Sequence, residues 1–192
     1  MLELLVALGI FSLVIVSVAW LAIHGFRYNA IIWEQLKTQS DGRRVLREAI
    51  DVVRKAEQSS VGSYPIASAG AYDLSVYSNV DSDSYREKVR LWLDGTTFKR
   101  NIIKPSGSPL AYSGAGQTVE IAHDVVNIAK GEAVFSYFDE NYTGSEAPLV
   151  QPVDTTKIRI IRVRLELEKD PTETPAPLRV ESASQVRNLK TN

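Results

Sequence analysis

The first 23 residues form an almost unbroken apolar stretch, MLELLVALGIFSLVIVSVAWLAI, in which Glu3 is the only charged side chain. A helix of this length spans about 35 Å, which is enough to cross a hydrocarbon core of about 30 Å. Trp20, His24, Arg27 and Tyr28 follow as the aromatic and polar side chains that are typical of a membrane interface. The sequence therefore predicts a single membrane-spanning helix over residues 1–23.

Glu3 is the unusual feature of this stretch. A carboxylate inside a membrane span costs about 2.5–3.5 kcal/mol on insertion scales, so such groups usually serve a function. The alternative is that Glu3 lies at the membrane edge and reaches water. A cleaved secretory signal would start with basic residues and have a shorter apolar core, so it fits less well. A plain signal anchor explains the length of the stretch but not Glu3.

Residues 24–58 continue as an amphipathic helix, because apolar side chains recur at steps of three, four or seven residues. Gly42 is a weak point that costs about 1 kcal/mol relative to alanine. Ser40 or Asp41 could cap a new helix there. We predict one long helix to about Gln58, with a break at Asp41-Gly42 as the alternative. Its apolar stripe consists of Trp33, Leu36, Leu46, Ile50 and Val53, widened by Val45, Ala49, Val52 and Ala56.

Residues 59–192 consist of short segments of strand character separated by polar loops. Asp94-Gly95 is a strong hairpin signal between predicted strands at 88–93 and 96–103. The clearest strand is 157–168, where apolar and charged residues alternate and the regular phase begins near Ile160. Further strands are predicted at 72–78, 118–128 with a bend at His123-Asp124, 133–138 and 178–188, whereas 59–71 is expected to be a connection.

A long helix followed by hairpin-connected strands indicates an α+β fold, with the helix packed on one face of an antiparallel β-sheet. We expect three parts: residues 1–23 as the transmembrane helix, residues 24–58 as the amphipathic helix that packs on the globular domain, and residues 59–192 as the β-rich globular domain. No enzyme is predicted, since His123 and Asp124 are adjacent on a predicted strand and point to opposite faces.

Composition narrows the classes of function. The 22 basic and 23 acidic side chains give a formal charge of −1, which argues against a general nucleic-acid binder. The absence of cysteine excludes disulfides, thiolate zinc sites and cysteine nucleophiles. No cofactor is predicted.

Two clusters of acidic and amide side chains make calcium a minor alternative. Asp81 and Asp83 continue a one-three-five spacing that starts at Asn79, and Asp139 and Asn141 open a similar run. Neither run has the complete ligand set of a calcium loop, and Asp and Asn favour turns without any metal.

Residues 2–12, LELLVALGIFS, resemble the N-terminal segment of type IV pilins and type II secretion pseudopilins, in which an apolar helix carries one glutamate near its start. The stretches 95–100 (GTTFKR), 134–139 (VFSYFD), 162–165 (RVRL) and 184–188 (SQVRN) are similar to the minor pseudopilins called J and the minor pilins called W. Family precursors carry a basic leader that ends in glycine, followed by a phenylalanine that is methylated. The printed chain starts at Met1, so prepilin peptidase is an implied partner only with an upstream leader.

This resemblance implies a pilin-like fold and a structural subunit that helps to initiate or cap a type IV pilus-like or type II secretion filament. The subunit would wait in the cytoplasmic (inner) membrane with its C-terminal domain on the outer, periplasmic side. An assembly platform would then move it from the lipid bilayer into an extracytoplasmic filament with other minor and major pilins. No nucleic acid is implied as a direct partner.

The same resemblance implies roles for individual residues. Glu3 would meet the amino terminus of a neighbouring subunit, because a carboxylate in an apolar core needs an opposite charge. Helix packing in the filament core would use Leu4, Leu5, Leu8, Phe11 and Ile15. The alternative function is a membrane-anchored adhesin or binding module that does not polymerise, for which Glu3 would be dispensable.

Overall fold

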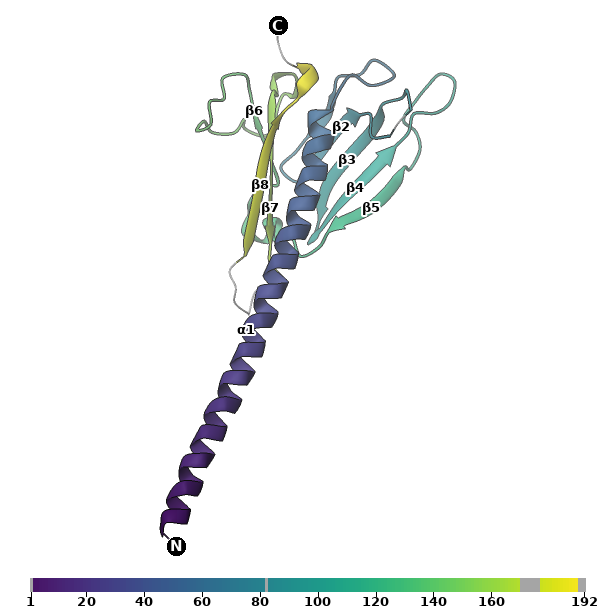
Figure 1. Ribbon diagram of the computed structural model, residues 1–192. Coiled ribbons are helices and arrows are strands. Elements are labelled where there is room, and N and C mark those ends of the chain that lie inside the picture. The colour runs from purple at the N-terminus through teal and green to yellow at the C-terminus, as the bar shows by residue number, and fades with distance from the viewer. Residues whose placement is uncertain (1, 82, 170–176, 190–192) are drawn as a thin grey trace. The chain divides into compact units, whose positions relative to one another are not determined.

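A computed structural model describes residues 2–81, 83–169 and 177–189 of the 192-residue chain (Figure 1). The chain divides into two compact units, Met1–Thr38 and Gln39–Asn192. The fold is α+β, as predicted, with one long N-terminal helix and antiparallel β-structure. Helix α1 (Leu2–Arg54) supplies the first unit and the start of the second.

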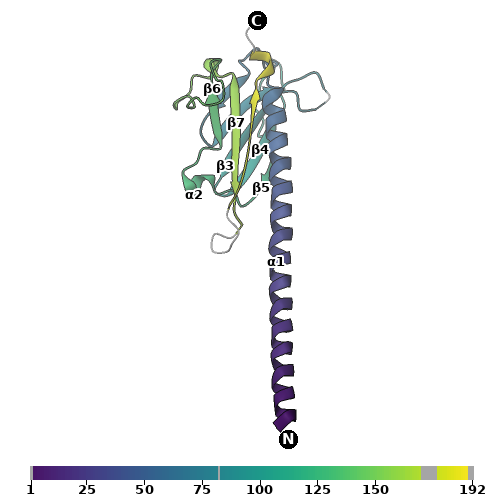
Figure 2. The ribbon, with the colours of Figure 1, turned by 60° about the vertical axis from the view of Figure 1, so that its left-hand side comes forward.

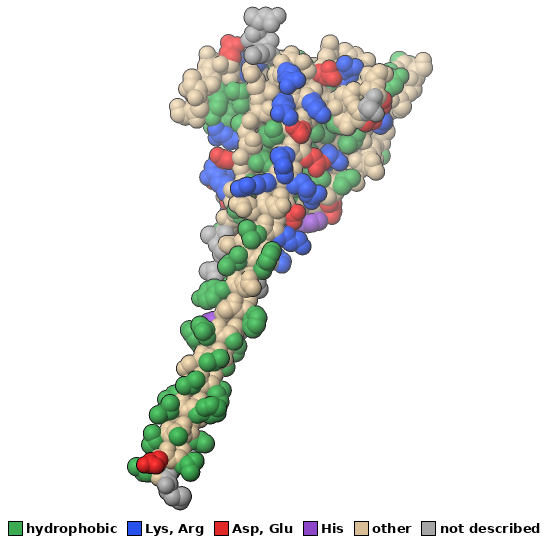
Figure 3. All heavy atoms as spheres, in the orientation of Figure 1, with side chains coloured by type: hydrophobic (Ala, Val, Ile, Leu, Met, Phe, Trp, Pro, Cys, Tyr) green, Lys and Arg blue, Asp and Glu red, His purple; other side chains and the backbone are tan. Residues whose placement is uncertain are grey.

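Helix α1 is continuous over its 53 residues, so the alternative of a break at Asp41-Gly42 is wrong. Its end at Arg54 lies four residues before the predicted Gln58. In the first unit the hydrophobic side chains are exposed along the helix, as Figure 3 shows. Trp33 and Leu36, which the sequence placed in the apolar stripe of the amphipathic helix, belong to this exposed part.

The first β-sheet of the second unit has five antiparallel strands in sequence order. Its strands are β1 (Ile66–Ala69), β2 (Asp73–Ser78), β3 (Glu87–Asp94), β4 (Thr97–Ile103) and β5 (Gln117–Ala122). The predicted hairpin at Asp94-Gly95 joins β3 to β4, and Gly95 has the positive φ of 59° that a tight turn favours. Strand β1 lies within the segment that was predicted to be a connection.

A second antiparallel sheet has the order β6-β7-β8, with β6 (Phe135–Phe138), β7 (Ile160–Leu167) and β8 (Leu178–Gln185). Two 3-10 turns, η1 (Thr155–Lys157) and η2 (Arg187–Leu189), precede β7 and follow β8. The predicted strand 118–128 ends at Ala122 instead, because Asp124 has a positive φ of 60° and the chain enters the short helix α2 (Asn127–Lys130).

The core of the second unit lies between the end of α1 and the two sheets. The buried positions of the helix repeat at steps of three and four residues: Gly42, Val45, Leu46, Ala49, Val52 and Val53. Glu48 forms an ion pair with Arg100 on β4. Gly42 lies against Leu167 on β7 and Val180 on β8. Residues 42–53 therefore contact both sheets, through Gly42 on β7 and β8 and through Glu48 on β4 (Figures 1 and 2).

Candidate functional site

The apolar N-terminal part of α1 has no packing partner among the described residues. The five residues implied in filament packing, Leu4, Leu5, Leu8, Phe11 and Ile15, are between 52% and 73% exposed. Leu4, Leu8, Phe11 and Ile15 follow one another at steps of four, three and four residues, so they form one stripe along the helix. This stretch makes α1 long and apolar enough to cross a membrane.

Glu3 differs from the other polar side chains of this stretch. The hydroxyls of Ser12 and Ser17 donate to the carbonyl oxygens of Leu8 and Leu13 at 2.7 and 2.8 Å. They are therefore satisfied within the helix. Glu3 is exposed and forms no hydrogen bond or ion pair with any other residue that the structure describes. The described part of the chain therefore offers no positive group to this carboxylate.

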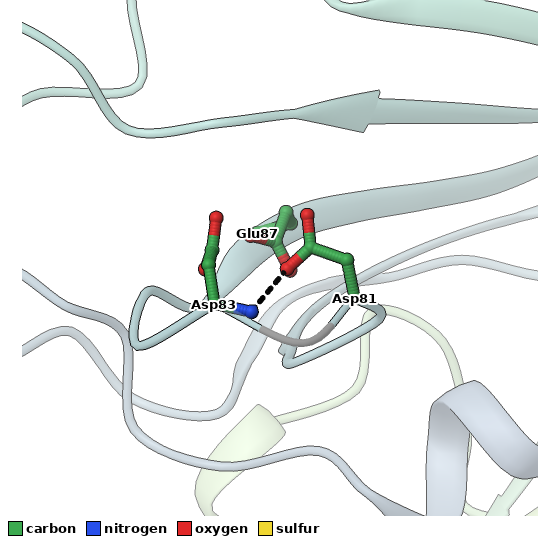
Figure 4. Close-up of side chains that lie close together, drawn as sticks. All are labelled: Asp81, Asp83 and Glu87. Atoms are coloured by element: carbon green, nitrogen blue, oxygen red, sulfur yellow. Dashed lines mark hydrogen bonds between the residues drawn. The ribbon is translucent and has the colours of Figure 1, made fainter.

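A second candidate site lies in the turn between β2 and β3, where Asp81 and Asp83 meet Glu87, the first residue of β3 (Figure 4). Carboxylate oxygens of these three residues lie within 4.8 Å of one another. The backbone N–H of Asp83 donates to Asp81 Oδ1 at 3.0 Å, which holds the turn in place. The structure thus joins the two predicted aspartates to a third carboxylate.

Among the described ion pairs, Lys104 is the cation that pairs with both aspartates. It directly follows β4. Its ammonium group pairs with Asp81 and lies 3.1 Å from Asp83 Oδ2. The hydrogen bond to Lys104 is the main cause that lowers the pKa of Asp81. The hydrogen bonds to Asp81 and then Asp83 raise the pKa of Lys104. Asp81 therefore stays ionised at neutral pH.

Sequence reasoning missed Glu87 and Lys104 as members of this cluster. Glu87 is in phase with Val89 and Leu91, which alternate on the buried face of β3, so the strand pattern held the signal for its burial. The strand was predicted to begin one residue later, at Lys88. Lys104 lies 23 positions from Asp81 in the sequence and reaches the turn only through the pairing of β3 with β4.

The second predicted calcium cluster, Asp139 and Asn141, forms a hydrogen-bonded turn. Both carboxylate oxygens of Asp139 accept hydrogen bonds from Asn141, one from the backbone N–H at 2.9 Å and one from the side-chain amide at 3.2 Å. This geometry is that of an Asx turn. Among the described residues, Asp139 belongs to no group of three acidic, histidine or cysteine side chains that could hold a metal ion.

No family model matches the chain, and no curated protein is significantly similar to it. The function must therefore be inferred from the residues of this chain. Two features stand out from the ordinary packing of the domain, namely the exposed apolar helix with Glu3 and the acidic turn around Glu87.

Proposed function

We propose that this protein is a minor pilin or pseudopilin, a membrane-inserted structural subunit of a type IV pilus-like or type II secretion filament. The observation that carries the proposal is a single helix, Leu2–Arg54, whose apolar first part is exposed and whose last part is built into the core of an α+β domain. The resemblance of residues 2–12 to pilin N-terminal segments supports the same assignment.

The exposed stripe explains why the first part of α1 needs other molecules. Transfer of one large apolar side chain out of water is worth about 1.5–3 kcal/mol. Leu4, Leu8, Phe11 and Ile15 are all more than half exposed in the isolated chain. Lipid satisfies them before assembly, and the apolar helices of neighbouring subunits would satisfy them in the filament core.

Glu3 gives this apolar contact a direction and a register. A carboxylate buried among apolar helices is stable only beside a positive group, and removal of one member of such a pair costs about 3–5 kcal/mol. The amino terminus of a neighbouring subunit would be the positive group. Recruitment into the filament would thus depend on one acidic side chain, whereas insertion into the membrane would depend on the apolar residues around it.

The test compares the assembly of Glu3→Ala and Glu3→Gln with the unchanged chain, each expressed behind a prepilin leader in cells that make the remaining filament subunits. Glu140→Ala is a matched control, because Glu140 is also exposed but lies in a loop of the globular domain. Subunit is quantified in sheared filaments and in pull-downs with partner minor pilins. Membrane fractionation measures insertion separately.

We expect both Glu3 variants to enter the membrane normally and to reach filaments at least about tenfold less than the unchanged chain, while Glu140→Ala behaves normally. Equal incorporation of the Glu3 variants would contradict the role of the carboxylate. Absence of the unchanged chain from filaments would contradict the pilin function. It would favour a membrane-anchored adhesin or binding module.

A further inference from the structure

Glu87 has the properties of a metal ligand rather than of a surface carboxylate. Its side chain is fully buried at the start of β3, next to the turn that carries Asp81 and Asp83. Glu87 Oε2 accepts a hydrogen bond from the backbone N–H of Val80 at 3.0 Å. Glu87 Oε1 is buried and has no hydrogen-bond partner among the described residues. A buried, half-satisfied carboxylate is costly unless something positive occupies the adjacent space.

Ser78 adds a second buried polar atom at the same place. Ser78 on β2 and Glu87 on β3 are directly paired positions of the antiparallel ladder, so their side chains share one face of the sheet. Ser78 is fully buried, and its hydroxyl oxygen also lacks a partner in the described part of the chain. Two buried oxygens at paired positions of the hairpin thus lack a described protein partner, as the donor atoms of a ligand site do.

The turn also carries more negative than positive charge. Three carboxylates face one another in Figure 4, and Lys104 supplies one positive charge, which it places on Asp81 and Asp83. None of the ion pairs among the described residues reaches Glu87. The Lys104 side chain is 59% exposed, so it can move into solvent when a stronger cation arrives.

The ligand type favours a hard cation such as Ca²⁺. Ca²⁺ binds carboxylate oxygens at about 2.4 Å, so ligands on opposite sides of the ion lie about 4.8 Å apart. The oxygens of this cluster are no more than 4.8 Å apart, so a single ion can reach all three. Mg²⁺ requires an octahedron with distances of about 2.0–2.1 Å and gives up its water reluctantly, so a site with three protein carboxylates suits it less well.

We propose that Asp81, Asp83 and Glu87 form a Ca²⁺ site in which the ion displaces Lys104 from the two aspartates. Glu87 supplies the buried ligand, and the aspartates supply ligands on the solvent side. The bound ion would tie the turn to the β2–β3 hairpin, beside the point where Ala56 pairs with Ser78 just beyond the end of α1. This site is independent of the proposed filament function, because every residue in it belongs to the globular domain.

The experiment uses the full chain in detergent after treatment with EDTA. Binding of CaCl₂ is measured by calorimetry and by the thermal midpoint, with NaCl at the same ionic strength as the reference. We expect a dissociation constant of about 10⁻⁴–10⁻³ M, as in other weak extracellular calcium sites. The backbone amide signal of Val80, which donates to Glu87, should shift on addition of Ca²⁺ but not of NaCl.

Three variants decide the outcome. Glu87→Gln keeps the shape of the side chain and should weaken Ca²⁺ binding at least about tenfold, since ligand charge sets affinity. Lys104→Met should bind Ca²⁺ more tightly, because the competing cation is gone. Asp139→Asn is the matched control from the other aspartate turn and should bind like the unchanged chain. If Glu87→Gln fails to fold, Asp83→Asn at the exposed rim replaces it, with the same expected loss.

Two results would overturn the proposal. One is the absence of a calcium-specific response in both the unchanged chain and Lys104→Met at about 10 mM, well above the expected dissociation constant. The other is Ca²⁺ binding that is equally tight in Glu87→Gln, or in Asp83→Asn where that variant replaces it. In that case the ion would be held by other groups.

Discussion

Gly42 is a point at which helix α1 lies close to the second sheet. A Cβ atom at this position would lie 2.6 Å from Leu167 Cδ1 and 3.4 Å from Val180 Cγ2. Carbon atoms that are not bonded pack at about 3.5–4.0 Å, so the first contact is a clash. Leu167 is itself 5% exposed and has little free space to enter. We therefore predict that Gly42→Val destabilises the globular domain.

The size of the effect is the difference between two opposing terms. Valine is a better helix former than glycine by about 0.5 kcal/mol, which favours the variant. Overpacking of a dense core costs about 1–3 kcal/mol, and valine adds three carbon atoms against Leu167 and Val180, so the upper half of that range applies. We expect a net loss of about 2 kcal/mol and a thermal midpoint lowered by about 4–8 °C.

The assay is thermal and urea unfolding of the full chain in detergent, followed by near-ultraviolet circular dichroism and by hydrogen exchange of the β7 amides. Gly25→Val is the matched control, because a Cβ atom at Gly25 has no neighbour within 4 Å. It makes the same chemical change in the same helix, and it should leave the exchange protection of β7 unchanged.

A double-mutant cycle tests the cause of the loss. Leu167→Ala removes the atom that the new side chain would strike, so Gly42→Val should cost less in that background than in the unchanged chain. Equal or greater stability of Gly42→Val than of the unchanged chain would refute the close contact between α1 and β7. An equal cost in both backgrounds would refute Leu167 as its source.

Two further predictions concern polar groups of the domain. Asn127→Ala should destabilise it by about 1–3 kcal/mol in urea unfolding, because the buried Asn127 amide donates to Arg164 O at 3.1 Å and accepts from Glu166 N at 2.8 Å. Hydrogen bonds from Thr143, its hydroxyl first, lower the pKa of Glu146 from its ordinary 4.5 to about 2. The stabilisation from this carboxylate should be complete above about pH 4.5 and vanish as the pH falls through 2, and Thr143→Val should raise the pKa in a carboxyl NMR titration.

Periodicity in the sequence predicted the elements that have one buried face. The alternation in β7 and the hairpin between β3 and β4 were recognisable because one face is apolar and the turn contains Asp94-Gly95. Strand β1 was missed because its four residues, IASA, carry little pattern and its pairing with β2 shifts register between Ile66 and Ser68. A short edge strand of this kind is stabilised by pairing with its neighbour more than by the β-propensity of its own residues.

The same limit applies to Gly42 and to the acidic turn. In isolation Gly42 indicates a weak helix, yet in the fold its missing side chain allows the approach of Leu167. The spacing of Asp81 and Asp83 was visible in the sequence, and the alternation of β3 could have added Glu87. The participation of Lys104 depends on strand pairing across 21 to 23 positions, which local patterns do not reveal.

The distribution of exposed apolar side chains locates the surface that needs another molecule. Most large hydrophobic side chains that are exposed lie in residues 2–36, and elsewhere in the described chain only Val61, Tyr85, Val119, Ile128 and Val150 join them. At about 1.5–3 kcal/mol for each side chain, a stretch of this size does not stay in water. Lipid alone would satisfy the apolar residues, but a hydrocarbon core offers no positive group to Glu3. A neighbouring chain with a free amino terminus offers both, which is why we propose assembly rather than anchoring alone.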